Sequence, residues 1–270
     1  MNADYGKPHG LKQTESGSNG WFRRLQMQYF ADADGARFYW QTANTYLAQT
    51  ERALIEHLRL GGHERLLEVG CGEGGNLKLL GTRPRQVIGV DYSLGKVRWA
   101  AQHVSRASFA RADATVLPFA GETFDMVLCR DVLHHLETAD KQRVIAEMLR
   151  VCRDGGQVVV IEPNGVNPIM RLQGLMVEAE QDILKNSLHR LEGLIDRRTC
   201  GTARVIWAQP FPIGRILFHY RWGLPRFSHV LAGLVLALED LIGKLLPSRC
   251  SGYIIIMMDK GEPRVQGSPA

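Results

Sequence analysis

The sequence predicts an α/β fold in which a Rossmann-like sheet of seven mostly parallel strands is flanked by helices. One observation is the alternation of short runs rich in Val and Ile with helical stretches, which is typical of βαβ units. A second is composition, since 270 residues with 45% apolar and 23% charged side chains suit one α/β domain with insertions, or two small domains. A third is a turn crowded with glycines directly after the first apolar run.

The alternation follows a helical stretch at residues 41–60, where apolar residues recur close to helical spacing until Gly61 and Gly62 end it. Five strands and the helices between them are expected in the next part of the chain. The strands are expected at 65–70, 86–92, 107–113, 124–131 and 157–163. The helices are expected at 76–80, 94–104 and 141–152.

The rhythm changes after Pro163. Residues 168–195 and 214–246 have a helical pattern, 202–211 is the expected sixth strand, and 251–260 is the expected last strand. The Ile-Ile-Ile-Met-Met run of that last strand is too short to span a bilayer and suits burial on both faces of a sheet.

The predicted division of the chain follows these elements. Polar ends at 1–20 and 261–270 are expected to be mobile tails. Between them lie a helical cap at 21–62, a cofactor-binding core at 63–164 and a remainder of the same domain at 165–260. That remainder holds a helical insert at about 212–248, which we expect to form a substrate lid, and then the final strand.

Composition also limits the surroundings of the chain. A net charge of +5 and a pI near 9.0 are mildly basic and do not by themselves distinguish nucleic acid, an anionic membrane and an anionic substrate. Five isolated cysteines indicate neither a zinc site nor a disulfide framework, and they favour a reducing cytoplasm. The N-terminus lacks an apolar signal-peptide region, and no uncharged apolar run is long enough to span a bilayer. We therefore expect a cytoplasmic protein, soluble or peripheral at a membrane.

The stretch LLEVGCGEGG, residues 66–75, raises the question of which cofactor touches its bare backbone. Gly70, Gly72 and Gly75 satisfy the pattern G-x-G-x-x-G after a strand, and Asp91 ends the next strand, 21 positions after Gly70. Both features match the fingerprint of nicotinamide dinucleotides. These residues alone do not distinguish a dinucleotide from a cofactor without a pyrophosphate.

Three further residues favour a cofactor without a pyrophosphate. Gly74 adds another bare position to the loop. Glu68, at the end of the first strand, would repel a pyrophosphate but could organise a loop that faces a cation. Asp113 ends the third strand, where it could accept a hydrogen bond from the amino group of adenine, with the backbone of Ala114 beside a ring nitrogen. Because parallel strands end at one edge of a sheet, four strand-end residues should meet there: Gly70, Asp91, Asp113 and Asp131.

Four segments together resemble the successive motifs of class I S-adenosylmethionine-dependent methyltransferases. They are LLEVGCGEGG, VIGVDYS, RADATVLPFAGETFDMVLCRDVLHHL and MLRVCRDGGQVVVIEPN. The nearest subgroup is the small-molecule type that includes ubiquinone/menaquinone methyltransferase-like enzymes. The likeness runs from about Leu66 to Asn164. It implies the class I methyltransferase fold and S-adenosyl-L-methionine as cofactor, and it says much less about the substrate.

The resemblance also implies roles at the methionine end of the cofactor. Gly70, Cys71 and Gly72 would pass under the methionine and ribose, and the backbone carbonyl of Arg130 would accept a hydrogen bond from the methionine ammonium. The alternative for the glycines is that they only permit tight packing at a strand-to-helix turn.

At the adenosine end, the resemblance implies that Asp91 accepts hydrogen bonds from both ribose hydroxyls and that Tyr92 lies against the adenine. Asp113 and Ala114 would hold the edge of the adenine ring. These assignments have structural alternatives, since Asp91 could cap the next helix or form an Asx-turn, and Tyr92 could be an ordinary aromatic residue at the rim.

Methyl transfer from a sulfonium is an in-line displacement, so much of its rate can come from placing the nucleophile on the methyl axis. A base is needed only if the acceptor loses a proton, and the candidates near the rim are Asp131, His134, His135 and Glu162. We expect only one of the two histidines to face the pocket, with His135 the favoured base; the alternative is that His134 packs or caps and His135 merely shapes the site. Glu162 is expected either to orient the substrate or to bind backbone. No metal site is expected, because adjacent histidine side chains should diverge and no third ligand has suitable spacing.

The span between Asp196 and Glu239 is the candidate acceptor region. It contains no acid but has six arginines: Arg197, Arg198, Arg204, Arg215, Arg221 and Arg226. Aromatic residues are interleaved with them, and the apolar run VLAGLVLALEDLIGKLLP follows. We expect an apolar lid over the pocket whose basic edge docks on an anionic membrane or on a phosphate-bearing substrate. The alternative for residues 230–246 is a core helix or a homodimer interface.

The leading interpretation is a methyltransferase that acts on a small apolar or lipid-linked acceptor, with O- or C-methylation favoured over N-methylation. Nucleic acid is not expected, because CRDVLHHL stands where amino-group nucleic-acid methyltransferases carry DPPY or NPPY. The alternatives are a noncatalytic, cofactor-binding partner subunit on the same fold and, less favoured, a nicotinamide-dependent oxidoreductase. Tyr29, Tyr39 and Trp40 could line the site from the cap or pack as core aromatics.

Overall fold

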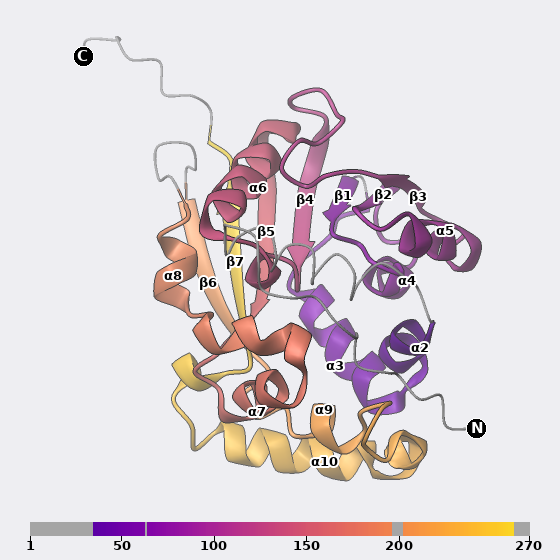
Figure 1. Cartoon of the computed structure of the whole chain (residues 1–270), viewed down its shortest axis with the longest axis vertical. Helices are drawn as coiled ribbons and strands as arrows, with labels where there is room; N and C mark the ends of the chain where they lie inside the picture. Colours follow the sequence, from indigo (N-terminus) through magenta and orange to yellow (C-terminus); the bar gives the residue numbers. More distant parts are fainter. Residues whose placement is uncertain (1–34, 63, 196–201, 262–270) are drawn as a thin grey trace, which may run out of the picture.

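The computed structural model describes residues 35–62, 64–195 and 202–261 of the 270-residue chain. Within these ranges a seven-stranded sheet runs through the molecule and helices pack around it (Figure 1). Several predictions fall outside the described residues and are not addressed by the structure. They concern the tails at 1–20 and 262–270, the part of the cap before residue 35, Tyr29, Arg197 and Arg198.

The strands are arranged in the order β3-β2-β1-β4-β5-β7-β6. Their bounds are β1 Arg65–Val69, β2 Gln86–Asp91, β3 Ser108–Arg111, β4 Phe124–Arg130, β5 Cys152–Pro163, β6 Thr202–Ala208 and β7 Tyr253–Asp259. The first five strands pair in parallel, whereas β7 lies antiparallel between β5 and β6. The predicted α/β class and mostly parallel sheet are confirmed. The strand order switches between β1 and β4, so a ligand crevice is expected at their carboxyl ends.

Alternate strand residues face two hydrophobic cores, one on each side of the sheet. In β1, Leu66 belongs to one core and Leu67 to the other, and in β7 Ile255 and Ile256 divide in the same way. One core is completed by α3 (Thr45–Glu56), α4 (Gly75–Leu80) and α7 (Pro168–Met176), and the other by α6 (Thr138–Val151) and α8 (Leu188–Glu192). Burial on both faces explains why these strands are continuous apolar runs in the sequence.

The N-terminal helical stretch consists of two helices rather than one. The first is α2 (Ala36–Ala43), and α3 begins directly after Asn44. Asn44 has an extended backbone, and its side-chain oxygen accepts a hydrogen bond from the Leu47 N–H at 3.1 Å. This cap starts a new helix and ends the previous one. The spacing of apolar residues at 41–60 does not reveal it, because both helices keep an apolar stripe.

Other element boundaries differ from the prediction by a few residues. β5 begins at Cys152 because this residue already pairs with Phe124 of β4. The helix expected at 94–104 is α5 (Leu94–His103), and the stretch at 168–195 divides into α7, the 3-10 segment η2 (Glu178–Lys185) and α8. None of the helices in the described part of the chain has the length and apolar composition needed to cross a bilayer.

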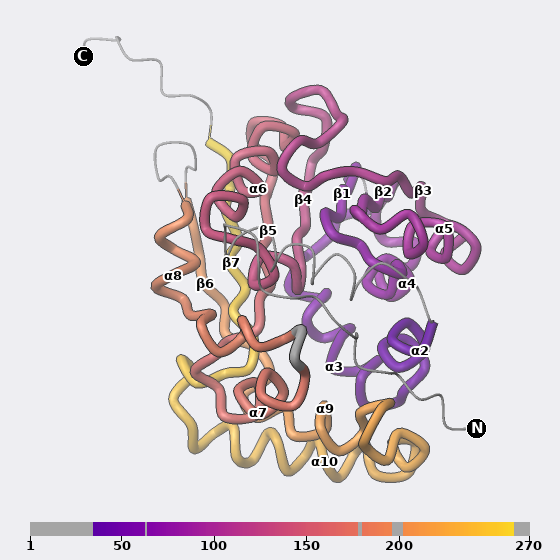
Figure 2. The backbone as a smooth tube through the Cα atoms, viewed as in Figure 1, coloured from indigo at the N-terminus to yellow at the C-terminus, as the bar shows by residue number. Residues whose placement is uncertain are grey.

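The insert before the last strand packs on the N-terminal helices (Figure 2). It contains α9 (Gly214–Leu217), the 3-10 turn η3 (Pro225–Phe227) and α10 (Ser228–Gly243). Ala232 and Val235 of α10 share a buried cluster with Trp40 of α2. The Tyr46 hydroxyl of α3 donates a hydrogen bond to the Glu239 carboxylate of α10 at 2.7 Å. The predicted N-terminal helices and helical insert are therefore confirmed, and they form one layer.

A buried carboxylate joins this layer to the sheet. Glu51 of α3 is 1% exposed and forms ion pairs with Arg130, at the end of β4, and with Arg215 of α9. The Arg215 Nη1 atom lies 2.8 Å from Glu51 Oε1. Burial by itself would raise the pKa of Glu51, but the guanidinium groups of Arg130 and Arg215 hold it below its usual range. All three charges are buried, so each depends on the others for compensation.

We expect Glu51→Gln to lower the free energy of unfolding by about 3–5 kcal/mol, because it removes the carboxylate that Arg130 and Arg215 share in a buried site. Urea titration followed by circular dichroism measures this change. Glu56→Gln, at an exposed position of the same helix, is the control and should change the free energy by less than about 0.5 kcal/mol. Equal effects of the two substitutions would contradict the proposed role of Glu51.

Candidate functional site

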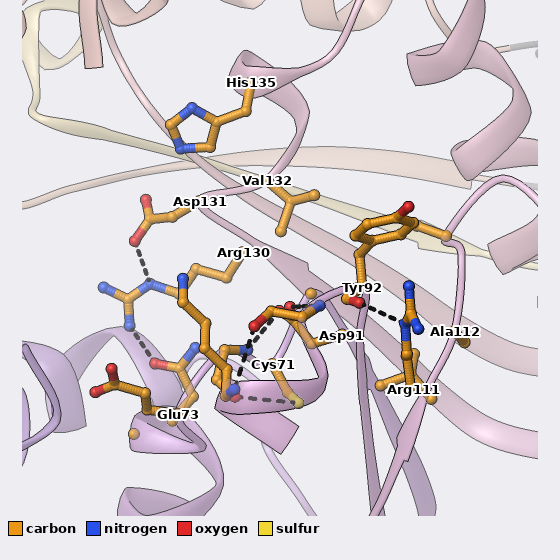
Figure 3. A pocket seen from close by; sticks show the side chains of 18 of the residues that line it. Cys71, Glu73, Asp91, Tyr92, Arg111, Ala112, Arg130, Asp131, Val132 and His135 are labelled. Atoms are coloured by element: carbon orange, nitrogen blue, oxygen red, sulfur yellow. Dashed lines mark hydrogen bonds and ion pairs between the residues drawn. The ribbon is translucent and has the colours of Figure 1, made fainter. Parts of the chain in front are cut away.

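A cavity of about 480 Å³ lies at the carboxyl edge of the sheet (Figure 3). This is within the range of about 300–1,000 Å³ that is usual for small-molecule sites. Most predicted site residues line it: Gly70, Cys71, Gly72, Asp91, Tyr92, Asp113, Ala114, Arg130 and His135. Asp131 lines it as well, so the four predicted strand-end residues do meet at one edge. Glu68, His134 and Glu162 are not among the lining residues.

The glycine loop forms one wall of the cavity. Gly70 has a φ of 75°, and a Cβ there would lie 2.2 Å from Cγ2 of Val132, so glycine is required. Gly72 faces open space, since no heavy atom of the described residues lies within 4 Å of where its Cβ would be. A ligand can therefore touch the backbone at Gly72. The Cys71 thiol between them is buried, and burial raises its pKa, so it is a neutral wall rather than a nucleophile.

Asp91 ties the glycine loop to the end of β2. Its Oδ2 atom accepts a hydrogen bond from the Gly72 N–H at 2.8 Å, and its Oδ1 atom accepts one from the Ser93 N–H at 2.9 Å. The second bond is the Asx-turn that the sequence left open as an alternative. Each carboxylate oxygen has a further lone pair, so Asp91 can fix the loop and still accept hydrogen bonds from two ligand hydroxyls.

Tyr92 lines the cavity next to Arg111 (Figure 3). Its ring is 45% exposed, and the guanidinium carbon of Arg111 lies 5.1 Å from the ring centroid. Arg111 also donates a hydrogen bond from Nε to the Tyr92 carbonyl at 3.0 Å. These contacts hold an aromatic face at the rim, where a flat ligand ring can stack.

Asp113 is oriented by its own turn. Its Oδ1 atom accepts hydrogen bonds from the backbone N–H of Thr115 at 2.9 Å and from the hydroxyl of the same residue at 2.7 Å. Asp113, Ala114 and Thr115 all line the cavity. A carboxylate and a short backbone segment therefore lie side by side there, and this pairing can bind the amino edge of a purine.

Glu68 requires a correction, because it lies behind the glycine loop and not in the cavity. It is fully buried, and its Oε1 atom accepts a hydrogen bond from the Asn76 side-chain amide at 2.6 Å. Burial raises the pKa of Glu68 to about 8, so its carboxyl group is largely protonated at neutral pH. Glu68 can organise the loop through Asn76, but it does not act on a ligand as a full negative charge.

Arg130 and Asp131 form the wall where β4 ends (Figure 3). The prediction gave Arg130 a backbone role only, yet its buried guanidinium pairs with Glu51 and donates a hydrogen bond to Asn76 Oδ1 at 2.9 Å. Arg130 Nε also lies 3.5 Å from Asp131 Oδ2. Asp131 has a φ of 53°, and burial raises its pKa despite the charge of Arg130. A strained acidic residue at a cavity wall is typical of a functional position.

His134 is held between two carboxylates. Its Nδ1 atom lies 2.7 Å from Glu162 Oε2 and its Nε2 atom 3.1 Å from Glu180 Oε2. Glu162 also accepts hydrogen bonds from the backbone N–H groups of Val132 and Leu133. We call Glu162, His134 and Glu180 the carboxylate clamp. Burial alone would lower the pKa of His134, but Glu162 and Glu180 raise it to about 10, so the imidazole is protonated at neutral pH.

The clamp corrects the predicted catalytic set. His134 and Glu162 are at most 1% exposed and lie behind the cavity wall, so neither can reach a ligand in the cavity. Glu162 binds local backbone and His134 packs, and each of these was the stated alternative to a role in catalysis or substrate binding. Their role is to hold the turn η1 (Leu133–His135) in place.

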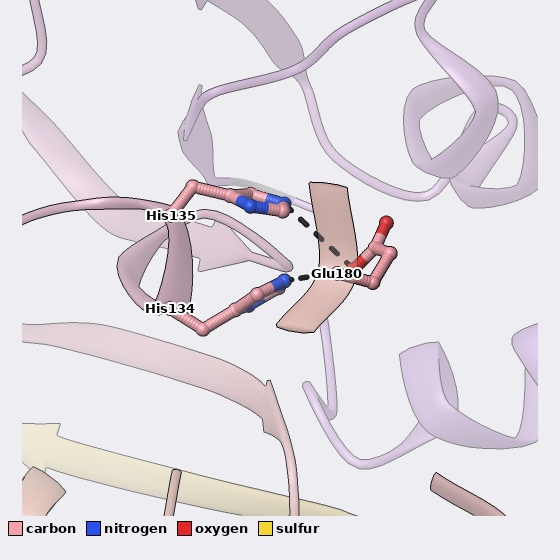
Figure 4. A group of neighbouring side chains, drawn as sticks. All are labelled: His134, His135 and Glu180. Atoms are coloured by element: carbon pink, nitrogen blue, oxygen red, sulfur yellow. Dashed lines mark hydrogen bonds and ion pairs between the residues drawn. The ribbon is translucent and has the colours of Figure 1, made fainter. Parts of the chain in front are cut away.

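His135 lines the cavity, as predicted. The rings of His134 and His135 have centroids 3.8 Å apart, so the expectation that adjacent side chains diverge is wrong. The tight turn η1 brings both rings toward Glu180, whose Oε2 atom lies 3.9 Å from His135 Nε2 (Figure 4). Burial and the charge of His134 lower the pKa of His135 well below its ordinary value. Its imidazole is therefore neutral at neutral pH and can accept a proton.

The same three residues could hold a cation, because the ligand atoms of His134, His135 and Glu180 lie within 4.8 Å of one another (Figure 4). The sequence did not reveal a third ligand, because Glu180 is distant from the two histidines in the chain and approaches them only in the folded structure. Two observations favour the hydrogen-bonded clamp over a metal. Both ring nitrogens of His134 face carboxylates, and a metal would have to displace the proton that His134 retains. The absence of a metal site stays a prediction.

A smaller cavity of about 100 Å³ adjoins the first. The two cavities share Arg37, Gln41, Glu73, Lys96, Arg130 and Asp131. Its other walls come from the cap, the segment after β5 and the insert, including Trp40, Glu180, Arg215, Tyr220 and Arg221. Trp40 thus lines a cavity, whereas Tyr39 is 52% exposed and packs its ring against Trp99.

Sequence reasoning missed Arg37, Glu51 and Glu180, because each is a single charge on a helical segment without a motif around it. A usable signal exists for two other residues. Arg130 in VLCRDV and Arg215 in PIGRILF are lone cations next to apolar runs, a pattern that indicates a buried and paired charge.

Comparison with known protein families identifies the middle of the chain. Residues 67–160 match the family model of a methyltransferase domain. This range contains the glycine loop, Asp91, Asp113 and His135, and it ends within β5.

Two curated relatives show similarity over the same part of the chain. A demethylmenaquinone methyltransferase of Renibacterium salmoninarum is 33% identical over 99 residues, which cover 37% of this chain and 41% of the relative. Phosphoethanolamine N-methyltransferase 1 of Triticum aestivum is 29% identical over 117 residues, which cover 42% of this chain and 23% of the relative. The chain thus spans less than half the length of these relatives.

A solved structure extends the likeness to most of the fold. Phosphoethanolamine N-methyltransferase 2 of Haemonchus contortus, in complex with S-adenosyl-L-methionine, has a TM-score of 0.62 and 22% identity. The match covers 89% of this chain and 60% of that one. At this identity the likeness concerns the fold.

We expect the carboxylate clamp to make stability depend on pH. The folded pKa of His134 lies above its unfolded value of about 6.5, so its contribution is fully present below about pH 6.5 and is lost as pH rises toward 10. The difference in unfolding free energy between the wild type and His134→Gln should therefore narrow between pH 6.5 and 10. Urea titrations of both proteins at several pH values measure this difference in unfolding free energy.

The matched control for this experiment is His189→Gln, which removes an exposed histidine of α8. The difference between this variant and the wild type should not narrow over the same pH range. A constant difference for His134→Gln would show that His134 is not held as a cation in the folded state.

Proposed function

Because residues 67–160 form a methyltransferase domain of the class I S-adenosylmethionine-dependent type, we propose that this chain transfers a methyl group to a small-molecule acceptor. The observation that carries the proposal is one cavity lined by the bare backbone at Gly72, by the ribose-binding candidate Asp91 and by the purine-binding candidate Asp113. The structural alternatives, a tight turn at the glycines and an Asx-turn at Asp91, would not require these three residues to line the same cavity.

The residues of the cavity fit S-adenosyl-L-methionine from end to end. Tyr92, Asp113 and Ala114 would hold the adenine, Asp91 the ribose hydroxyls, and the backbone of Gly70 to Gly72 the methionine part. Arg130 would offer its carbonyl to the ammonium, while its guanidinium stays with Glu51. When bound, the cofactor supplies a methyl group that is already activated on a sulfonium. The chain then has to bind the acceptor, exclude water and accept a proton where one is released.

The first turn of α4 is covered by side chains, and this disfavours a nicotinamide dinucleotide. Such a cofactor places its pyrophosphate at the N-terminus of the helix that follows the glycine loop. Here a Cβ on Gly75 would lie 2.1 Å from Gln41 Oε1, and Gln41 donates a hydrogen bond to Asn76 Oδ1 at 2.7 Å. Glu73 adds a carboxylate that accepts a hydrogen bond from the Phe38 N–H at 3.1 Å. Helix α2 and an acidic side chain thus occupy the space where the pyrophosphate would lie.

His135 is our candidate for the general base. It lines the cofactor cavity, its imidazole is neutral at neutral pH, and Glu180 lies 3.9 Å from its Nε2 atom. Asp131 is the second candidate, because it lines both cavities and burial raises its pKa. A noncatalytic partner subunit would need the cofactor residues but no such group, so a neutral histidine in the wall of the cofactor cavity supports turnover.

The smaller cavity is our candidate for the acceptor. Among the described residues, four carboxylates line it, and three of them are in ion pairs: Glu51 with Arg130 and Arg215, Asp131 with Arg130, and Glu180 with His134. The fourth, Glu73, accepts a hydrogen bond from the Phe38 N–H. Arg37, Lys96 and Arg221 add positive charge to its walls. This environment suits a phosphate or carboxylate group and disfavours a cationic amine. It therefore supports an anionic acceptor, with or without an apolar tail, and O- or C-methylation over N-methylation.

The names of the two curated relatives point to different acceptors. One is a demethylmenaquinone methyltransferase and the other a phosphoethanolamine N-methyltransferase. Each shares less than half of its length with this chain, so the acceptor is argued here from the cavity walls and not from either name.

We expect the protein to bind S-adenosylhomocysteine and not NAD in isothermal titration. Asp91→Ala should weaken this binding about tenfold or more, because it removes a charged acceptor for the ribose and one support of the glycine loop. Asp154→Asn, near the start of β5 and outside the cavity lining, is the control and should bind as the wild type does. Binding of NAD, or unchanged affinity in Asp91→Ala, would refute the cofactor assignment.

We expect His135→Gln to lower methyl transfer about 100-fold or more while S-adenosylhomocysteine affinity stays within a factor of about two. Release of S-adenosylhomocysteine is measured with a panel that contains phosphoethanolamine, a quinol and a polyprenyl phosphate. Asp131→Asn is tested beside it. If His135→Gln retains full activity on an acceptor that the wild type uses, His135 is not the base.

A further inference from the structure

Helix α10 exposes a continuous apolar stripe. Val230, Leu234, Leu238, Leu241 and Leu245 are 66, 70, 48, 60 and 80% exposed. They are spaced three or four residues apart, so they lie on one side of the helix and its C-terminal extension. We call them the α10 stripe. Helix α10 runs along one edge of the molecule, beyond α7 and α9 (Figure 1).

The core of the protein does not need this stripe. A second row on the same helix, formed by Ala232, Val235 and Glu239, is buried against the N-terminal helices. The predicted alternative, in which residues 230–246 are a core helix, is therefore correct for one face only. The helix has two apolar faces, and the outer one is not covered by the described residues.

Other segments on the same side of the molecule in Figure 1, α7 and the insert, also expose apolar side chains. Leu175 and Met176 of α7 are 66 and 44% exposed, and Leu217 and Leu224 of the insert are 45 and 56% exposed. Exposed apolar residues that occur singly are common, but a surface of this extent usually marks an interaction site.

The polar residues of these segments are strongly biased toward positive charge. Exposed cations are Arg171, Arg221, Arg226, Lys244 and Arg249. In the described segments 164–177 and 211–252, the one exposed carboxylate is Asp240, which pairs with Lys244 at 2.6 Å. Glu239, the other acid there, is buried in the hydrogen bond with Tyr46.

We propose that this surface docks on an anionic lipid bilayer, with α10 lying in the plane of the interface. Leucines enter the boundary between headgroups and acyl chains, while the surrounding arginines and Lys244 meet anionic headgroups. A second copy of the chain fits less well. In a two-fold dimer the same cations would face one another, and like charges across an interface are unfavourable.

The docking surface is continuous with the smaller cavity. Gln173 and Val177, at the end of α7, and Tyr220 and Arg221 of the insert line that cavity. The segments that carry the apolar surface therefore also form the cavity wall. If the proposed function holds, an acceptor with an anionic head and an apolar tail can be taken from the bilayer while its tail remains in lipid.

Co-sedimentation of the full chain with vesicles tests the docking without any assay of methyl transfer. We expect binding to vesicles of phosphatidylcholine with phosphatidylglycerol, and at least tenfold weaker binding to phosphatidylcholine alone. Leu234→Gln/Leu241→Gln should weaken binding about tenfold or more, because both side chains are exposed in solution and would be buried in lipid. Circular dichroism and S-adenosylhomocysteine affinity should not change.

Matched controls separate the docking surface from general effects. Val116→Gln removes an apolar side chain that is 71% exposed, close to the 70% of Leu234, but lies far from α10 in the fold. Arg226→Glu/Arg249→Glu is compared with Arg85→Glu/Arg106→Glu, which alters the net charge equally at exposed positions elsewhere. Only Arg226→Glu/Arg249→Glu should reduce vesicle binding more than fivefold.

Two results would overturn the proposal. One is the lack of binding to anionic vesicles, or binding that Leu234→Gln/Leu241→Gln leaves intact. The other is a concentration-dependent dimer that the same double substitution abolishes while vesicles do not bind. That second result would assign the surface to another copy of the chain.

Discussion

The Glu51 carboxylate lies between the guanidinium groups of Arg130 and Arg215, and this pairing joins three parts of the chain that are distant in sequence. Arg130 ends β4, Glu51 lies on the N-terminal helix α3, and Arg215 lies on α9 of the insert. None of the three charges is tolerable alone at this depth. The sheet edge, the cap and the insert are therefore held in one arrangement, and the smaller cavity is the space that remains between them.

A second set of buried charges positions the turn that carries His135. The carboxylate clamp uses Glu162 from the end of β5 and Glu180 from η2 to hold a protonated His134. The positive charge of His134, together with burial, keeps the neighbouring His135 neutral. One histidine is thus a structural cation and the next a neutral imidazole, although the two rings lie 3.8 Å apart. Their different roles come from what surrounds each ring, since the residue type is the same.

The part of the site that depends on backbone and local motif was predictable from the sequence. Gly70, Asp91 and Asp113 lie at or just after strand ends, with Gly72 in the loop that follows Gly70. A parallel sheet brings these strand ends to one edge, however the helices pack. Two of the residues that set the charge of the smaller cavity were not predictable in this way. Glu51 and Glu180 acquire their roles from contacts with Arg130, Arg215 and His134, which are formed by helix packing and not by spacing along the chain. The break at Asn44 was missed for a related reason, because a cap acts through one hydrogen bond that apolar periodicity does not record.

If the smaller cavity binds the acceptor, as proposed above, the same buried contacts bear on how that acceptor enters. Lifting the insert away from the sheet would separate Arg215 from Glu51 and Glu239 from Tyr46, and breaking one such buried ion pair costs about 3–5 kcal/mol. Entry past the end of α7, where Gln173 and Val177 line the cavity, breaks neither contact. Helix α7 also exposes the apolar side chains of Leu175 and Met176. An apolar tail can therefore stay on the outer surface while its polar head reaches the cavity, and the insert can remain closed throughout.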